Sequence, residues 1–386
     1  MNRSLHVCLR RDGACPVSTR LRLGALLLLL APCYASPPND PALAAALQPI
    51  LEKHHLPALA GALVTGDGAV RIGVVGVRKA GTAIAATPDD LWHLGSNTKA
   101  LTATVIARLV EQGQLTWETT LAEVFPDLAA DFDPAFRPVT IRQLLSHHAG
   151  LTGNLAWGRF NRSRTIQEQR VEALRLGLAK SPTYPIGAAP HYANLGYVIA
   201  GAIIERVTGQ AWEDVIRARL FDPLQLTRAG FGGLGAPGEL DQPWPHQAAD
   251  RPAQANGPDV DNPPVIGPAG RVHAPLADWA KFVADQLRGA RGEPALLKVE
   301  SYAALHTVAG EGDFALGWIV AQRGWGGGAV LTHNGCNTMN FSVAWLAPKR
   351  NFAVLICVNQ GDDGAARAAD EAAAALIEVH QRVAAP

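Results

Sequence analysis

The stretch from Leu91 to Val110 constrains the fold of this chain more than any other. It reads Leu-Trp-His-Leu-Gly-Ser-Asn-Thr-Lys and continues as a largely apolar run without proline, and Gly113 follows as a left-handed stop. The pattern predicts a helix that is apolar on most sides. Such a helix is expected to be buried, because it has no polar face to turn toward water. Its start is polar, from Ser96 to Lys99.

Ser96 and Lys99 stand three residues apart, which puts their side chains on one helix face, about 5–6 Å apart at Cβ. Burial disfavours an ammonium group, so Lys99 can lose its proton and help to remove the proton of Ser96. Backbone N–H groups at a helix start also favour developing negative charge there. The alternative is that Ser96 only caps the helix and Lys99 extends toward the surface, although a capping box has Glu or Gln at that third position.

The 386-residue chain is 48% hydrophobic and 18% charged, with a formal net charge of zero. It is long enough for a large core, and the neutral balance gives no support for a nucleic-acid partner or an anionic membrane surface. Beyond residue 35 only Cys336 and Cys357 remain, which permits one bridge but no disulfide framework. No Cys/His spacing is typical of a zinc site, since adjacent pairs such as His147-His148 do not share a helix face.

Residues 1–35 read as a secretory signal peptide. Arginines precede an apolar core from Leu23 to Ala31 that is too short to span a bilayer, and Cys33-Tyr34-Ala35 is similar to a cleavage site. We therefore expect residues 36–386 to form the mature protein, exported to the periplasm or the extracellular space. No stable membrane insertion is expected once the signal is removed.

Strand patterns lie at both ends of the mature chain. After a short helix predicted at 40–51, β-rich runs at 59–65 and 69–77 flank the hairpin signal Gly66-Asp67-Gly68. Strands are also predicted near the C-terminus, before a closing helix at 365–383; these are 316–321, 329–332, 340–346 and 352–359. Helical patterns fill the section between, at 121–124, 141–146, 166–178, 195–207, 212–220 and 277–287.

This order predicts an α/β (α+β) fold in which one antiparallel sheet is flanked by helices. The N-terminal hairpin is expected to join the C-terminal strands, and an all-helical subdomain is expected as an insertion at about 115–290. A ligand site is then expected at the seam between the sheet and the insertion.

The section from residue 228 to 271 is rich in Gly and Pro and shows no sustained period. A loop of this length is more often functional than idle. We expect it to form one wall of the site, with Trp244 suited to an uncharged part of a substrate. Its residues Asp250, Asp259 and Asp261 are interpreted as solvated rather than as calcium ligands.

Two short patterns carry further candidate residues. His191-Tyr192-Ala193-Asn194 precedes the helix predicted at 195–207. Tyr192 can carry a proton if a nearby cation lowers its pKa, and Asn194 can orient its neighbours through hydrogen bonds. The alternative is that Asn194 caps the helix and Tyr192 packs against it.

The second pattern, His333-Asn334-Gly335-Cys336, follows the strand predicted at 329–332. Gly335 would let a substrate approach the strand backbone closely. The N–H of Cys336 would then pair with the N–H of Ser96 as two oxyanion donors. The alternative is an ordinary strand end with a glycine bend.

Taken in this order, Ser-x-x-Lys, Tyr-x-Asn and His-x-Gly resemble the motifs of the serine penicillin-recognising enzymes, and most closely the class C β-lactamase-related, penicillin-binding-protein-like serine hydrolases. Three further stretches carry the resemblance, which covers about 47–376: Val139–Leu151, Asn194–Gly201 and Pro268–His273. No Gly-x-Ser-x-Gly occurs around Ser96, which argues against a nucleophile-elbow hydrolase.

The resemblance implies a β-lactamase/transpeptidase-like fold and an acyl-enzyme mechanism without metal or cofactor. By the same resemblance Ser96 is the nucleophile, Lys99 its proton partner, and Tyr192 the base or proton relay. Asn194 would orient Lys99 and the substrate. The strand edge would be lined by His333 and Gly335.

One departure bears on the substrate. β-Lactamases typically carry Lys-Thr-Gly where this chain has His-Asn-Gly, and His333 would be mostly neutral at pH 7. The His-x-Gly form resembles family esterases and D-amino-acid peptidases, so we expect a small ester, amide or D-amino-acid peptide as substrate. A true β-lactamase or D-Ala-D-Ala carboxypeptidase is the alternative. A non-catalytic peptidoglycan-peptide binder or sensor is an alternative of another class, although a binder would need neither the lysine nor the tyrosine.

Overall fold

The computed structural model of this chain describes residues 36–160 and 163–384. The predicted signal peptide, residues 1–35, lies outside the described residues and stays a prediction. In the part of the chain that the structure describes, no helix combines the length and the apolar character needed to cross a membrane.

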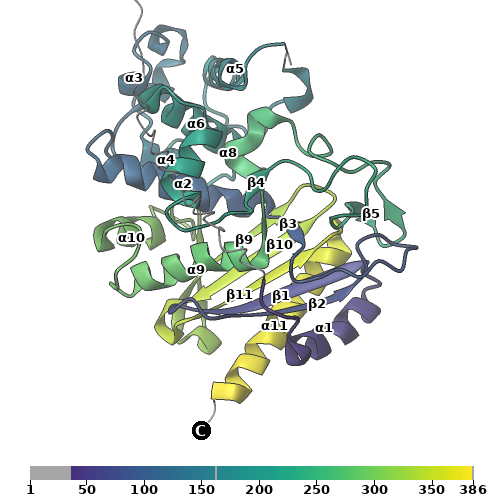
Figure 1. Cartoon of the computed structure of the whole chain (residues 1–386). Helices are drawn as coiled ribbons and strands as arrows, with labels where there is room; N and C mark the ends of the chain where they lie inside the picture. The colour runs from purple at the N-terminus through teal and green to yellow at the C-terminus, as the bar shows by residue number, and fades with distance from the viewer. Residues whose placement is uncertain (1–35, 161–162, 385–386) are drawn as a thin grey trace, which may run out of the picture. The chain divides into compact units, whose positions relative to one another are not determined.

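A six-stranded antiparallel sheet forms the centre of the fold, in the order β2-β1-β11-β10-β9-β8 (Figure 1). The strands are β1 Ala58–Thr65, β2 Val70–Gly76, β8 Ile319–Arg323, β9 Gly328–Cys336, β10 Phe341–Ala347 and β11 Phe352–Val358. β1 pairs with β11 from Leu59 opposite Val358 onward, so the N-terminal hairpin joins the C-terminal strands as predicted. Gly68, with φ +90°, makes the turn between β1 and β2.

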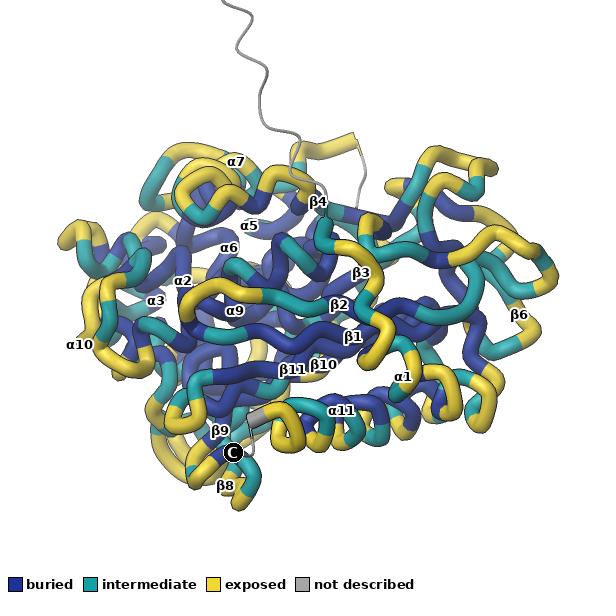
Figure 2. The backbone as a smooth tube through the Cα atoms, turned by 60° about the horizontal axis from the view of Figure 1, so that its bottom comes forward, coloured by how far each residue is buried: buried dark blue, intermediate teal, exposed yellow. Residues whose placement is uncertain are grey.

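Helices cover both faces of this sheet, which is why its central strand is buried on both sides. α1 (Pro41–Lys53) and α11 (Asp363–Ala384) lie together on one face (Figures 1 and 2). α9 (Leu276–Ala290) lies against the other. Along β11, Ile356 packs into the core beneath α1 and α11, whereas Leu355 and Cys357 pack into the larger core on the opposite face. This alternation follows from the two-residue period of a strand.

The central apolar stretch begins as a strand rather than as a helix, which corrects the prediction. β3 (Leu91–His93) pairs with β7 (Val272–Pro275), and a 3₁₀ turn at Gly95–Asn97 leads into α2 (Thr98–Glu111). The strand β3 forms because it pairs with β7, which is distant in the sequence. No local pattern in the sequence shows this pairing. α2 itself is buried over most of its length, and Gly113 adopts φ +70° after it, both as expected.

The section that follows is mainly helical, but it is not the all-helical insertion that the sequence predicted. β7 lies in it and pairs with β4, so that β3, β7 and β4 form a second small sheet. The short strands, of two to four residues, are too brief to show a period in the sequence; they are β4 Gly230–Phe231, β5 His246–Ala248, β6 Arg251–Pro252 and β7 Val272–Pro275. α10 (Val299–His306) was not predicted either.

The remaining helices of this section and its neighbours agree with the predicted positions within a few residues. They are α3 Leu121–Val124, α4 Ile141–Leu145, α5 Ile166–Leu178, α6 Asn194–Thr208, and α7 Trp212–Ile216 with a π-helical continuation at Arg217–Phe221. The short helix α8 Gly267–Gly270 was not predicted, because it lies in the section that the sequence analysis interpreted as a loop. Short 3₁₀ turns lie at Ala129–Asp131, Pro134–Phe136, Trp157–Arg159, Pro264–Ile266, Gly324–Gly326 and Pro348–Arg350. Cys336 and Cys357 both carry free thiols.

Candidate active site

The structure brings together the predicted residues from three segments that are far apart in the sequence. Ser96 lies in the 3₁₀ turn before α2, and Lys99 lies in the first turn of α2. Tyr192 and Asn194 lie at the start of α6, and β9 carries the His-x-Gly residues. The Tyr192 hydroxyl donates to Ser96 Oγ at 2.8 Å, and Lys99 Nζ lies 3.0 Å from the same oxygen.

Lys99 is fully buried, so the alternative of a surface lysine is wrong. Its Nζ donates to Asn194 Oδ1 and to the carbonyl of Ala269, each at 2.7 Å, and contacts Ser96 Oγ as a third partner. None of the three is a carboxylate. Burial lowers the pKa of Lys99 well below its usual value.

The three contacts would satisfy the three N–H groups of an ammonium, but the lowered pKa of Lys99 favours loss of one proton, which leaves two N–H groups and one lone pair. The two N–H groups serve Asn194 and Ala269. In that neutral form the lone pair faces Ser96 Oγ, which accepts from the Tyr192 hydroxyl. In this arrangement Lys99 is placed to receive the Ser96 proton.

Tyr192 differs from the expectation of a lowered pKa. Burial raises the pKa of Tyr192 to about 12, although its hydrogen bond with Ser96 acts in the opposite direction. The residue as a whole is 41% exposed, although its hydroxyl donates to Ser96 Oγ. Tyr192 is therefore a protonated hydrogen-bond donor near pH 7.

Asn194 does not cap α6, which overturns that alternative. The N-cap is Ala193, without a side-chain hydrogen bond, and Asn194 uses its Oδ1 for Lys99. Its Nδ2 donates to Asn154 Oδ1 at 2.9 Å, and Trp157 Nε1 donates to the same oxygen at 3.0 Å. These bonds fix which end of the Asn194 amide faces Lys99. No local sequence pattern pointed to Asn154, which lies in an irregular segment.

His147 is a second residue that the sequence analysis did not assign to the site. Its Nδ1 accepts the N–H of Ala193 at 3.1 Å, and its ring lies 4.6 Å from that of Tyr192, centroid to centroid. Burial lowers the pKa of His147 well below its usual value, which keeps Nδ1 free to accept. His147 also adopts φ +65°, a conformation that is uncommon for a residue with a side chain. It therefore holds the segment that carries Tyr192.

His333 is buried and is not a titratable cation at working pH. Burial lowers the pKa of His333 to about 3. Its Nδ1 lies 2.6 Å from the carbonyl of Asn334, so Nδ1–H is the donor and the ring is neutral. The strand edge consequently carries no charge from this residue near pH 7.

Gly335 has a different steric role from the predicted one. A Cβ at Gly335 would lie 2.1 Å from the carbonyl oxygen of Leu94 and 2.7 Å from the nitrogen of Ser96. A Cβ at Gly95 would lie 2.6 Å from the nitrogen of Cys336. The glycines thus allow the turn before α2 to lie directly against β9, rather than making room for a substrate. This approach brings the backbone N–H groups of Ser96 and Cys336 to one place.

Two residues of the long Gly- and Pro-rich section, 228–271, do not have the surroundings that the sequence predicted. Trp244 is 5% exposed and lies beneath Lys79, whose Nζ is 3.5 Å from the ring centroid, so it does not line a substrate wall. Asp261 is not solvated, because its side chain is fully buried against His93 and Arg271. Among the described residues, no group of three or more His, Cys, Asp and Glu side chains is arranged to hold a metal ion.

Comparisons with known proteins place the chain in a family. A family model described as Beta-lactamase matches residues 43–378. Penicillin-binding protein 4 of Amycolatopsis lactamdurans is 31% identical over 329 residues, which are 80% of this chain and 82% of that protein. Protein flp of Staphylococcus aureus (strain COL) is 23% identical over 317 residues, 80% of this chain, and this chain spans only 61% of its length.

A solved structure shows the same fold. The D-amino acid amidase from Ochrobactrum anthropi SV3, complexed with L-phenylalanine, superposes with a TM-score of 0.71 over 89% of this chain and 99% of that chain. The two sequences are 20% identical, and a likeness at this level shows the fold alone.

The pH dependence of Ser96 reactivity tests the neutral state of Lys99. Labelling by a fluorophosphonate should become faster as the pH rises through the lowered pKa of Lys99 and should be constant above it, because the neutral amine accepts the Ser96 proton. The pKa values of His333 (about 3) and Tyr192 (about 12) lie outside a range of pH 5 to 10, so a single rise is expected. A rate that still increases about tenfold between pH 9 and 10 would contradict the lowered lysine pKa.

Proposed function

Because the chain belongs to the beta-lactamase family, we propose that it is a serine hydrolase that cleaves small ester or amide substrates through an acyl-enzyme on Ser96. The observation that carries the proposal is the double contact of Ser96 Oγ. It meets the buried Lys99, whose pKa is lowered by burial, on one side and the protonated Tyr192 on the other. This pair can remove a proton from the serine and supply one to a leaving group.

The proposed reaction follows from these contacts. Lys99 takes the proton of Ser96 while Oγ bonds to the substrate carbonyl carbon, and the carbonyl oxygen becomes an oxyanion. The N–H groups of Ser96 and Cys336 donate to that oxyanion. As the carbonyl re-forms, the bond to the leaving group breaks, Tyr192 gives it a proton, and the proton held by Lys99 restores the phenol. Water then releases the acyl group by the reverse sequence of proton transfers.

The neutral state of His333 supports an uncharged substrate over one that carries a carboxylate beside the scissile bond. Short-chain esters and D-amino-acid amides fit this description, and the structurally similar Ochrobactrum protein is a D-amino acid amidase. β-Lactam hydrolysis and D-Ala-D-Ala carboxypeptidase activity are the alternatives, since both bind a substrate carboxylate. The signal peptide predicted at residues 1–35 supports action in the periplasm or outside the cell.

A non-catalytic role in binding peptidoglycan peptides is the competing proposal of another class. It gives no reason for an amine to be buried without a carboxylate partner beside a serine hydroxyl. The contacts of Lys99 therefore favour catalysis.

Substitutions in the proton path test the proposed mechanism. Ser96→Ala should abolish fluorophosphonate labelling and turnover, whereas Lys99→Met and Tyr192→Phe should each lower kcat by about 10²- to 10⁴-fold. The double variant should lose much less than the product of the two losses, because both groups serve the same proton transfers. Lys79→Met is the matched control, since this lysine lies over Trp244 and should not affect kcat. Stoichiometric labelling of Ser96→Ala would show that another residue is the nucleophile.

The second prediction concerns substrate choice. His333→Lys places an ammonium on a longer side chain at the strand edge, so kcat/KM for a carboxylate-bearing substrate should rise about tenfold or more relative to its methyl ester. His333→Gln, which is neutral like the native ring, should leave this ratio unchanged. In the unmodified protein the ratio should be constant between pH 5 and 9, because His333 is already deprotonated there. Efficient nitrocefin turnover with negligible p-nitrophenyl acetate cleavage would instead support a β-lactamase.

A further inference from the structure

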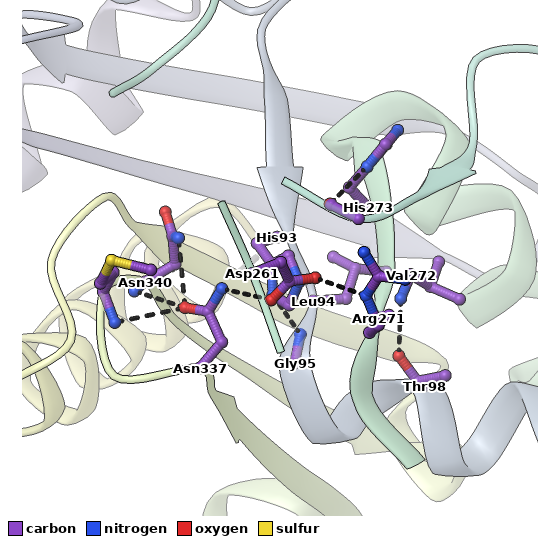
Figure 3. Close-up of polar contacts among 12 residues, drawn as sticks. His93, Leu94, Gly95, Thr98, Asp261, Arg271, Val272, His273, Asn337 and Asn340 are labelled. Carbon is purple, nitrogen blue, oxygen red and sulfur yellow. Dashed lines mark hydrogen bonds and ion pairs between the residues drawn. The ribbon is translucent and has the colours of Figure 1, made fainter. Parts of the chain in front are cut away.

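A buried carboxylate connects the two sides of the candidate oxyanion site. Figure 3 shows Asp261 between His93, Arg271 and Asn337, which come from β3, from the end of α8 and from the turn after β9. His93 Nε2 lies 2.9 Å from Asp261 Oδ2, and Arg271 Nε donates to the same oxygen at 3.2 Å. Asn337 Nδ2 donates to the other oxygen, Oδ1, at 2.9 Å. The side chains of His93 and Asp261 have no exposed surface.

His93 connects Asp261 to the residue before Ser96. The N–H of Gly95 donates to His93 Nδ1 at 3.1 Å, so Nδ1 is the acceptor and Nε2–H faces Asp261. The hydrogen bond to Asp261 therefore fixes both the tautomer and the orientation of the ring. The ring in turn fixes the peptide of Gly95, next to the N–H of Ser96.

Asn337, the residue after Cys336, connects Asp261 to the turn that follows β9. While its Nδ2 donates to Asp261, its Oδ1 accepts the N–H groups of Met339 at 3.3 Å and of Asn340 at 2.9 Å. The turn it closes contains Thr338 at φ +70°, a conformation that a β-branched residue adopts only when its surroundings enforce it. Asp261 thus holds the side chain that closes this strained turn.

The charge of Asp261 is stable over the pH range in which a hydrolase works. Burial raises the pKa of Asp261, but His93, Arg271 and Asn337 outweigh this effect and bring it down to about 2. A buried carboxylate with three donors is rigid, because removing any one of them leaves part of its charge uncompensated. The network is therefore suited to hold two backbone segments in a fixed relation.

We propose that Asp261 is a positioning residue, which aligns the N–H groups of Ser96 and Cys336 on one substrate oxygen. It does so by fixing the residue before Ser96 through His93 and the turn after Cys336 through Asn337. The inference rests on the proposed acyl-enzyme function. Gly95 and Gly335 leave no space for side chains between the two segments, so the relation of the N–H groups depends on how the flanking residues are fixed. A donor that is shifted from the oxyanion loses stabilisation of the transition state more than binding of the substrate.

Asp261→Asn is the direct test, because it keeps the size of the side chain but replaces one acceptor oxygen with a donor. The kcat for a p-nitrophenyl ester should fall about 10- to 100-fold while KM changes by less than about threefold. Affinity for a boronic acid, whose tetrahedral adduct on serine places an oxygen at the oxyanion position, should fall by a similar factor. The rise of labelling rate with pH should keep its position, since the contacts of Lys99 are not altered.

The control is Asp285→Asn, a buried carboxylate on α9 that accepts from Tyr302 and from the N–H of Leu296. It should lower the stability without changing kcat or boronate affinity. Asn337→Ala is the second variant, in case Asp261→Asn does not fold; it should reproduce the fall in kcat, because it removes the connection to the Cys336 side alone.

The outcomes separate this inference from the proposed function. If the unmodified protein neither labels on Ser96 nor hydrolyses esters, the proposed function fails. If it does both, but Asp261→Asn and Asn337→Ala lose stability with unchanged kcat and boronate affinity, Asp261 has only a structural role and the inference is overturned. A rise in KM at constant kcat would also overturn it, because that result would make Asp261 part of the substrate-binding surface.

Discussion

The buried amine of Lys99 is the interaction on which the rest of the site depends. An ammonium at a fully buried position without a carboxylate would cost several kcal/mol, so the fold accepts this lysine as a neutral amine. A neutral amine needs two acceptors and one donor. Asn194 and the Ala269 carbonyl are the acceptors, and Ser96 Oγ, 3.0 Å from Nζ, is the group toward which the lone pair of the neutral amine would point. Loss of its proton lowers the energetic cost of burying Lys99, and the resulting neutral amine can act as a base toward Ser96.

Each partner of Lys99 is fixed by packing elsewhere in the molecule. The Ala269 carbonyl lies in α8, where Pro268 packs so closely on Gly201 of α6 that a Cβ there would lie 2.2 Å from its ring. The segment before α8 is tied down by the buried Arg170, which donates to the carbonyls of Pro264 and Val265 and pairs with two glutamates, from α6 and α7. On the other side, β9 lies directly against the turn that holds Ser96. The helical section and the sheet thus meet at the serine.

The sequence predicted those features that depend on local pattern. The hairpin, the C-terminal strands and the Ser96–Lys99 spacing are read from periods of two and of three to four residues, and the structure confirms them. The short strand β3 and the roles of Asn154, His147 and Asp261 depend on contacts between distant segments, which no local pattern contains. A lowered pKa of Tyr192 is not found for a related reason, because the burial that raises it to about 12 comes from packing between distant segments.

The protonation state of Lys99 is the most direct test of this account. NMR of protein labelled with ¹³C at lysine Cε, with the Lys99 signal assigned by its loss in Lys99→Met, reports whether the amine carries a proton. The account predicts the chemical shift of a neutral amine at pH 8, with a titration well below that of the exposed lysines. A Lys99 signal that remains that of an ammonium up to about pH 10, together with the other lysines, would contradict it.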